Sequence, residues 1–178
     1  NTEFEVMTQM NVHDFGTGEY PYKTILQDTT CESIAYNLKE LGLSTHVLHN
    51  NTATFYDRDK VFSKLGFDSF TSIEYMNDVE YNEIGWAKDS ILTGGILDLL
   101  DSTASRDLIY TISVQPHGAY PTDSESDGIR VLSGIEDEAL RSEMEYYATQ
   151  LQEVDDFLRA LTAALEALDE PTVLVVYG

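Results

Sequence analysis

Asp107-Leu-Ile-Tyr-Thr-Ile-Ser-Val114 carries apolar side chains on both of its alternating faces, interrupted only by small hydroxyls. A strand with one face in water would instead alternate apolar and polar residues. We therefore predict a strand over 107–114 that is covered on both sides, as in a mostly parallel sheet. Such a sheet needs helices on its faces, so the neighbouring segments should alternate between helix and strand.

The segments before this strand show the expected alternation. Residues 90–100 place apolar side chains at helical spacing, although two adjacent glycines each weaken a helix there by about 1 kcal/mol relative to alanine. Ser44-Thr-His-Val-Leu-His49 is a short β-branched run, so we predict a second strand there. Further helices are predicted on either side of that strand, over about 29–41 and 58–65.

The segments after residue 114 continue the pattern. Over 136–168, apolar residues recur every three or four positions among acidic or small neighbours, which indicates a long amphipathic helix. Thr172-Val-Leu-Val-Val-Tyr177 is typical of a buried strand. The whole order predicts the α/β class with right-handed crossovers. Because no repeat or low-complexity linker interrupts the sequence, we predict a single domain over 1–178.

Composition limits the possible partners. The chain has 178 residues, 42% of them apolar, which suits one domain with a sizeable core. It carries 10 basic and 32 acidic residues, a formal charge of -22, which repels phosphate backbones and excludes nucleic acid as an expected partner. The sequence lacks a run of roughly 20 apolar residues, and its first ten residues lack the pattern of a signal peptide. We therefore expect a soluble, unanchored chain.

The single cysteine, Cys31, excludes an internal disulfide and a multi-cysteine metal site. It lies in a helical pattern beside Ile34 and Ala35, so we expect a packed thiol rather than a catalytic one. The loop aromatics, among them Phe55 and Tyr56, favour packing over ligand recognition on their pattern alone.

Three segments fall at the carboxyl ends of predicted strands, where open α/β sheets bind ligands. They are His49 with the loop to Arg58, residues 115–120 with His117, and residues 177–178. Their convergence would place two imidazoles and a guanidinium in one crevice. This set suits an anion, because arginine offers a planar fork to phosphate and histidine can donate to its oxygens or transfer a proton. On spacing alone, a role in shaping the loops remains the alternative.

Several sequence strings together resemble the lipoteichoic acid synthase family. Residues 1–8 look like the stretch just after the nucleophilic threonine of that family. The other matching strings, in chain order, are His49-Asn-Asn-Thr-Ala-Thr-Phe-Tyr-Asp-Arg-Asp-Lys-Val-Phe-Ser-Lys-Leu-Gly-Phe-Asp68, Gly85-Trp86 with Asp89, Gln115-Pro-His117-Gly-Ala-Tyr120 and Pro171-Thr-Val-Leu-Val-Val-Tyr-Gly178. The resemblance implies a partial layered fold of the alkaline phosphatase and sulfatase superfamily, with a mostly parallel sheet and helices on both faces.

The resemblance also implies an activity for the parent protein. Members of the family are membrane-anchored enzymes at the extracellular face of the cell membrane. They transfer glycerol phosphate from phosphatidylglycerol to a growing glycerol-phosphate polymer, using a phosphorylated threonine and a divalent metal, usually manganese. We expect the parent protein to contact the membrane only through an anchor that is absent from this chain.

Four residues, His49, Tyr56, Arg58 and His117, match the substrate-phosphate pocket of the family by position. The resemblance assigns substrate binding to His49, Asn51, Tyr56 and Arg58, and a catalytic role to His117. Tyr56 stands where some members carry tryptophan, and Asn51 where some carry aspartate. These two differences leave the reaction class unchanged but alter the expected contacts to glycerol.

The sequence departs from the family at the metal. None of the four metal ligands that the family uses is present in this sequence. Thr2 aligns after the nucleophilic threonine of the family rather than with it. We therefore expect a fragment of the enzyme that binds no metal, is inactive by itself and exposes sheet edges able to pair with another chain. Two alternatives remain open: a sulfatase-like hydrolase of the same superfamily, and a non-catalytic domain that binds glycerol phosphate or another anion.

Overall fold

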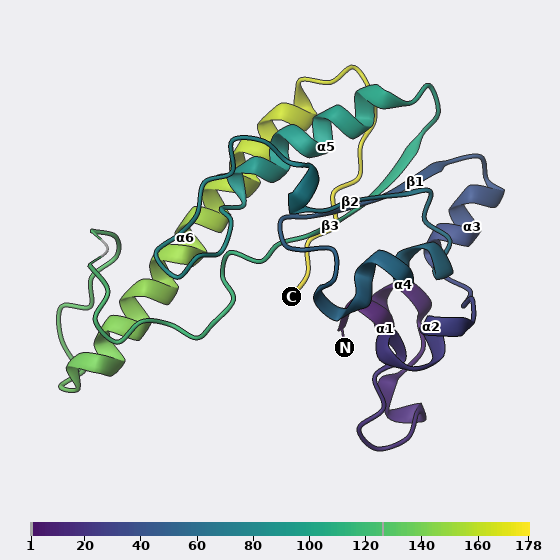
Figure 1. Ribbon diagram of the computed structural model, residues 1–178. Coiled ribbons are helices and arrows are strands. Elements are labelled where there is room, and N and C mark those ends of the chain that lie inside the picture. The colour runs from purple at the N-terminus through teal and green to yellow at the C-terminus, as the bar shows by residue number, and fades with distance from the viewer. Residues whose placement is uncertain (1, 126) are drawn as a thin grey trace. The chain divides into compact units, whose positions relative to one another are not determined.

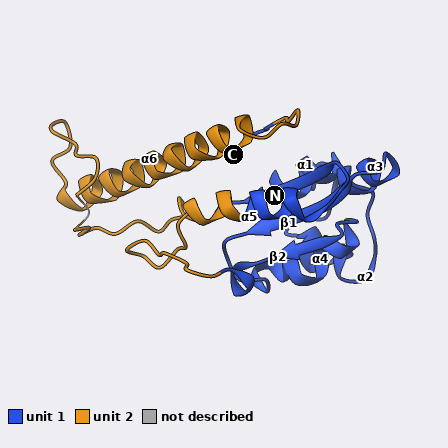
Figure 2. Ribbon diagram, turned by 90° about the horizontal axis from the view of Figure 1, so that it is seen from above, with its two compact units in different colours: residues 1–76, 95–112, 174–178 blue, residues 77–94, 113–173 orange. Residues whose placement is uncertain are grey.

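The computed structural model describes residues 2–125 and 127–178 (Figure 1). The chain divides into two compact units, shown in different colours in Figure 2. Unit 1 comprises Asn1–Met76, Gly95–Ile112 and Leu174–Gly178, and unit 2 comprises Asn77–Gly94 and Ser113–Val173. The single domain over 1–178 stays a prediction.

Unit 1 contains a parallel sheet of three strands. The central strand β1 (Ser44–His49) lies between β2 (Ser69–Thr71) and β3 (Asp107–Ile112), in the order β2-β1-β3. In this register Val47 of β1 lies opposite residues of both neighbours. Five of the six β1 residues are buried. The strand predicted to be covered on both faces is β3, and all six of its residues are only half-buried. The sheet confirms the predicted α/β class with parallel strands.

Short helices pack against one face of this sheet in unit 1. They are α1 (Thr2–Thr8), α2 (Ile25–Asp28), α3 (Ile34–Glu40) and α4 (Arg58–Lys64), joined by the 3-10 turns η1 (Val12–Asp14), η2 (Pro21–Lys23), η3 (Phe55–Asp57) and η4 (Ile73–Tyr75). Phe62 lies in the core and makes edge-to-face contacts with Tyr22, Phe67 and Phe70. Burial of each such side chain stabilises the fold by about 1.5–3 kcal/mol, so this core supplies much of the stability of unit 1.

The other face of β1 is covered by α5 (Ser90–Ser102), whose residues from Gly95 onward belong to unit 1. A Cβ added at Gly95 would lie only 2.9 Å from Cδ2 of Leu48. The glycine therefore lets the helix approach the sheet closely, which offsets its low helix propensity. Helices on both faces of the sheet confirm the predicted layered architecture.

The helix predicted over 29–41 is shorter in the structure. The Ser33 hydroxyl accepts from the Ala35 N–H at 3.1 Å and caps a helix that begins only at Ile34. The Cys31 N–H donates instead to the Lys64 carbonyl at 3.1 Å. The predicted helical position of Cys31 was therefore wrong, although the side chain does pack against the unit 1 core.

The strand predicted over 172–177 is absent. The segment is extended and largely exposed, with Val173 at 88% and Val175 at 74% exposure. Its link to the sheet is a hydrogen bond between the Tyr177 and Tyr110 hydroxyls. A β-branched run becomes a strand only where a neighbouring backbone completes the ladder, and no described strand pairs with this one.

Unit 2 is built around α6 (Glu138–Glu166), which confirms the predicted long helix. The Asp137 carboxylate caps it by accepting from the N–H groups of Ala139 and Leu140. The apolar face of the helix buries Phe157 and Leu161. Within residues 2–125 and 127–178, no helix combines the length and apolar character needed to cross a membrane.

Candidate functional site

His49 ends β1 and points into unit 1 at the carboxyl end of the sheet. It is 2% exposed, and its Nδ1 lies 2.8 Å from the Ile112 carbonyl. A carbonyl can only accept, so Nδ1 carries the proton and Nε2 is left with a lone pair. Nε2 then accepts from Nη1 of Arg58 at 3.3 Å. The strand end and the first residue of α4 are thus joined through one imidazole.

The charge state of His49 follows from its burial. Removal from water lowers the pKa of His49 to about 4, and the neighbouring Arg58 charge acts in the same direction. At neutral pH the imidazole is therefore uncharged. It can hold the guanidinium, but it adds no positive charge to the site.

Arg58 is 7% exposed and forms an ion pair with Glu3 of α1. Its Nη2 and Nε lie 2.8 and 3.4 Å from the two oxygens of that carboxylate, while Nη1 also donates to the Phe55 carbonyl at 3.3 Å. The Tyr22 hydroxyl donates to the same carboxylate at 2.7 Å, and burial first, then Glu3, raises the pKa of that tyrosine. Together with the His49 contact, four of the five guanidinium N–H directions are used within the protein.

The turn between β1 and α4 has an unusual backbone. Tyr56 and Asp57 are consecutive non-glycine residues in the left-handed region, with φ of 60° and 55°. Each such residue costs on the order of 1–3 kcal/mol and persists only where its surroundings hold it. The turn presents Tyr56 beside Phe55, with ring centroids 4.7 Å apart, and the Arg58 Cζ lies 5.5 Å from the Tyr56 centroid.

Asn51 shapes the loop before this turn. Its side-chain oxygen accepts from the Thr52 N–H at 2.7 Å, and its carbonyl accepts from the Ile73 N–H at 3.2 Å. Ala53, two residues after Asn51, donates its N–H to the Glu74 carboxylate at 3.1 Å. These contacts hold the loop in place, and a direct role of Asn51 in substrate binding stays a prediction.

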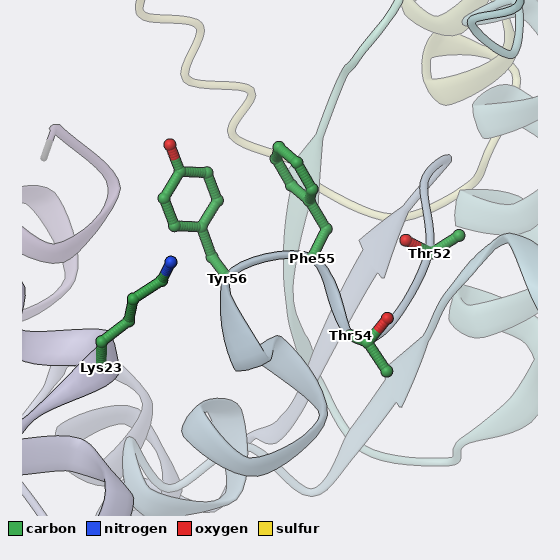
Figure 3. Close-up of a pocket in the computed structure, with 5 residues that line it drawn as sticks. All are labelled: Lys23, Thr52, Thr54, Phe55 and Tyr56. Atoms are coloured by element: carbon green, nitrogen blue, oxygen red, sulfur yellow. The ribbon is translucent and has the colours of Figure 1, made fainter.

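A pocket of about 380 Å³ opens beside this turn (Figure 3). Its walls are formed by Lys23, Thr52, Thr54, Phe55 and Tyr56. Of these, only Tyr56 was predicted as a site residue. No sequence pattern connects a lysine of one 3-10 turn with threonines some thirty positions later, so only the fold could reveal the group.

His117 lies in unit 2, in the loop that follows β3. It is exposed, and its Nδ1 lies 2.6 Å from the Gly118 carbonyl, so the neutral ring keeps a lone pair on Nε2. The ring contacts Trp86 edge-on at a centroid distance of 5.6 Å. Nε2 can therefore accept a proton, as a catalytic base requires. The convergence of His117 with His49 and the catalytic role of His117 stay predictions.

A divalent metal fits poorly on the residues that the structure describes. Over 2–125 and 127–178, no three His, Cys, Asp or Glu side chains are grouped so that they could hold one. Three or more such ligands are the usual minimum for a protein site of this kind.

The whole chain matches one known protein family. The sequence model of the family described as Sulfatase matches residues 1–178. The chain belongs to the sulfatase family. This sulfatase-family chain is 27% identical over 178 residues to a Rhizobium meliloti (strain 1021) protein named for cyclic beta-1,2-glucan modification. The alignment covers 100% of the chain and 28% of that relative, so the chain spans little more than a quarter of its length.

Two solved structures show the same fold. The lipoteichoic acid synthase LtaP of Listeria monocytogenes has a TM-score of 0.68 at 23% identity, over 91% of this chain and 39% of its own. The Streptococcus pyogenes phosphoglycerol transferase GacH, in complex with sn-glycerol-1-phosphate, has a TM-score of 0.64 at 20% identity, over 90% and 44%. The predicted alkaline phosphatase and sulfatase type of fold is thereby confirmed for this sulfatase-family chain.

Proposed function

We propose that this chain is the substrate-binding part of a phosphoglycerol transferase. The parent enzyme would transfer glycerol phosphate from phosphatidylglycerol, at the extracellular face of the membrane, to a glycerol-phosphate polymer. A phosphorylated threonine and a divalent metal such as manganese, both held by residues outside this chain, belong to the proposal. When bound, the metal would supply Lewis acidity and an activated nucleophile.

One observation carries the proposal: the buried Glu3–Arg58–His49 cluster adjoins a strained turn. That turn places Tyr56 in the wall of a pocket. This group lies at the carboxyl end of β1, the edge where open α/β sheets bind ligands. The fold is shared with GacH, whose solved structure contains sn-glycerol-1-phosphate. The strained turn supports the same view, because such strain gathers at ligand sites.

The proposed residues have different tasks. Tyr56 would pack its ring against the carbon skeleton of glycerol. Arg58 would give its remaining Nη2 N–H to a phosphate oxygen, with His49 fixing the guanidinium and Asn51 holding the loop. His117 would accept the proton of the attacking hydroxyl on Nε2 or return it to the leaving group.

The test is an activity assay on the parent protein with manganese present. We expect release of diacylglycerol from phosphatidylglycerol, and a loss of about tenfold in kcat/KM for Tyr56→Ala, because a packed ring at a ligand contributes about 1–2 kcal/mol. Tyr75→Ala is the matched control, since Tyr75 lies in η4 of unit 1 and is 76% exposed. The 178-residue chain alone should show no turnover.

The rival in the same family is a sulfatase-like hydrolase. Turnover of an aryl sulfate without any release of diacylglycerol would overturn the transferase proposal in its favour. Equal losses in the Tyr56→Ala and Tyr75→Ala variants would instead remove the pocket from the proposal.

A further inference from the structure

The polar side chains buried at the carboxyl end of β1 sum to no net charge. Arg58 is paired with Glu3 at 2.8 Å, and His49 is neutral because burial lowers its pKa to about 4. A cation that is already paired attracts a further anion only weakly. A phosphate bound in unit 1 therefore needs a second positive group.

Lys23 offers such a group at the pocket. Figure 3 shows its ammonium reaching toward the ring of Tyr56, and Nζ lies 5.5 Å from the ring centroid. The guanidinium carbon of the paired arginine lies at the same distance from that ring. Within the part of the chain that the structure describes, no carboxylate forms an ion pair with Lys23. In a chain with 32 acidic residues, this ammonium faces a pocket rather than an acid.

The segment that carries Lys23 is anchored. Pro21 and Tyr22 before it are buried, and the Lys23 N–H donates to the Tyr20 carbonyl at 2.8 Å. The Tyr22 hydroxyl donates to Glu3, the carboxylate that also holds the buried arginine. The lysine is thus mounted on the same framework as the site, which lowers the entropy cost of ordering it around a ligand.

The rest of the pocket wall indicates what else the ligand carries. Thr52 and Thr54 bring hydroxyl groups that can donate or accept, and Phe55 and Tyr56 bring two rings in edge-to-face contact. Hydroxyls match the hydroxyls of a polyol, while aromatic rings pack against its C–H groups. A lone inorganic anion would use neither.

We propose that Lys23 is a specificity-determining residue that binds the phosphate group of a short polyol phosphate, whose polyol part lies against Tyr56 and the two threonines. The inference rests on the proposed function and adds to it the cation that the phosphate meets in unit 1. Arg58, whose charge is paired with Glu3, then offers the phosphate only its one remaining N–H, and Lys23 supplies the unpaired positive charge.

The test measures the binding of sn-glycerol-1-phosphate to the 178-residue chain by isothermal titration calorimetry. Lys23→Gln should weaken binding at least tenfold, because a charge-assisted hydrogen bond is lost, and Lys23→Arg should restore most of it. Added NaCl should weaken binding to the unaltered chain more steeply than to Lys23→Gln. Lys64→Gln is the matched control, because it makes the same charge change on α4 of unit 1, away from the pocket.

Each outcome supports or overturns a separate statement. Equal affinity of Lys23→Gln and the unaltered chain, with Tyr56→Ala weakened, overturns the role of Lys23 and leaves the proposed function standing. Absence of binding to the unaltered chain, with its fold verified by circular dichroism, overturns both. Inorganic phosphate binding as tightly as the ester removes the polyol from the proposal, and glycerol binding as tightly removes the phosphate.

Discussion

Each end of β1 buries a histidine, but the groups that contact the two imidazoles differ. At the amino end, His46 Nδ1 lies 2.7 Å from the Ser69 hydroxyl, and Nε2 lies 3.3 Å from the Asp107 carboxylate. At the carboxyl end, His49 accepts from Arg58, whose charge is met by Glu3. The acid at the first end faces an imidazole, whereas the acid at the second end holds a guanidinium, a cation that cannot lose its proton.

The two ends of β1 also differ in which residues adopt the left-handed backbone conformation. Before β1 and β2, the left-handed positions are glycines, Gly42 at φ 83° and Gly66 at φ 87°, which adopt this conformation at no steric cost. After β1, the left-handed positions are Tyr56 and Asp57. The chain thus has strained backbone at non-glycine residues at the end of β1 that carries the pocket. This difference supports the proposal that the carboxyl end of β1 binds a ligand.

The largest effect should come from removing the acid at each end. Glu3→Gln leaves the Arg58 charge buried without its partner, so we expect a loss of about 3–5 kcal/mol in the free energy of unfolding. Asp107→Asn should cost only about 1 kcal/mol, because the amide oxygen still accepts from the Thr103 hydroxyl and no buried guanidinium loses its partner. Urea unfolding measures both. Glu40→Gln, on an exposed position of α3, should stay within about 0.5 kcal/mol of the unaltered chain.

An equal cost at the two ends, or a reversed order, would contradict the distinction between an acid that holds a buried guanidinium and an acid that faces an imidazole. The measurement is informative even if Glu3→Gln is largely unfolded, since that is the direction expected for an unpaired buried guanidinium.

The second effect is a pH dependence specific to His49. Its pKa is lowered in the folded chain from 6.5 to about 4, so the unfolded chain takes up the proton first as the pH falls. The contribution is fully present above pH 6.5 and is lost as the pH falls toward 4, by about 2 kcal/mol between pH 7 and pH 5. Urea unfolding at a series of pH values should show this loss, and His49→Gln should lack it. A His49→Gln variant with an unchanged pH slope would show that the imidazole is not buried in its neutral form.

The smallest effect concerns the left-handed positions and should have opposite signs at the two ends. Asp57→Gly removes strain and only an exposed contact to Lys60, so we expect a gain of about 0.5–1 kcal/mol. Gly42→Ala introduces the same kind of strain with no atom within 4 Å of the new Cβ, so we expect a loss of about 1 kcal/mol. Thermal unfolding of the pair provides the measurement. If Asp57→Gly destabilised the chain, the turn would not be strained as described.

Local periodicity was enough to predict the main elements. β1, β3, α5 and α6 each carry a run whose spacing is visible without the rest of the chain. β2 was missed because three residues hold too little pattern. The strand over 172–177 was wrong, because strand propensity says nothing about whether a partner backbone is present.

The site was harder to predict than the fold. His49 and Arg58 lie close in sequence and share a motif, so both could be singled out. Glu3 is 55 positions from its partner, and Lys23 comes from a turn without a regular pattern, so neither gave a signal. Sequence reasoning therefore suggested the arginine as the phosphate ligand but could not show that its charge is already met.

The central claim is that the carboxyl end of β1 binds a polyol phosphate and the amino end does not. The most direct measurement is a two-dimensional amide NMR titration of the chain with sn-glycerol-1-phosphate. We predict saturable shifts at the N–H groups of Lys23 and of residues 52–56, with those of His46, Ser69 and Asp107 unchanged. Shifts confined to the amino end, or spread equally over both ends, would contradict the account.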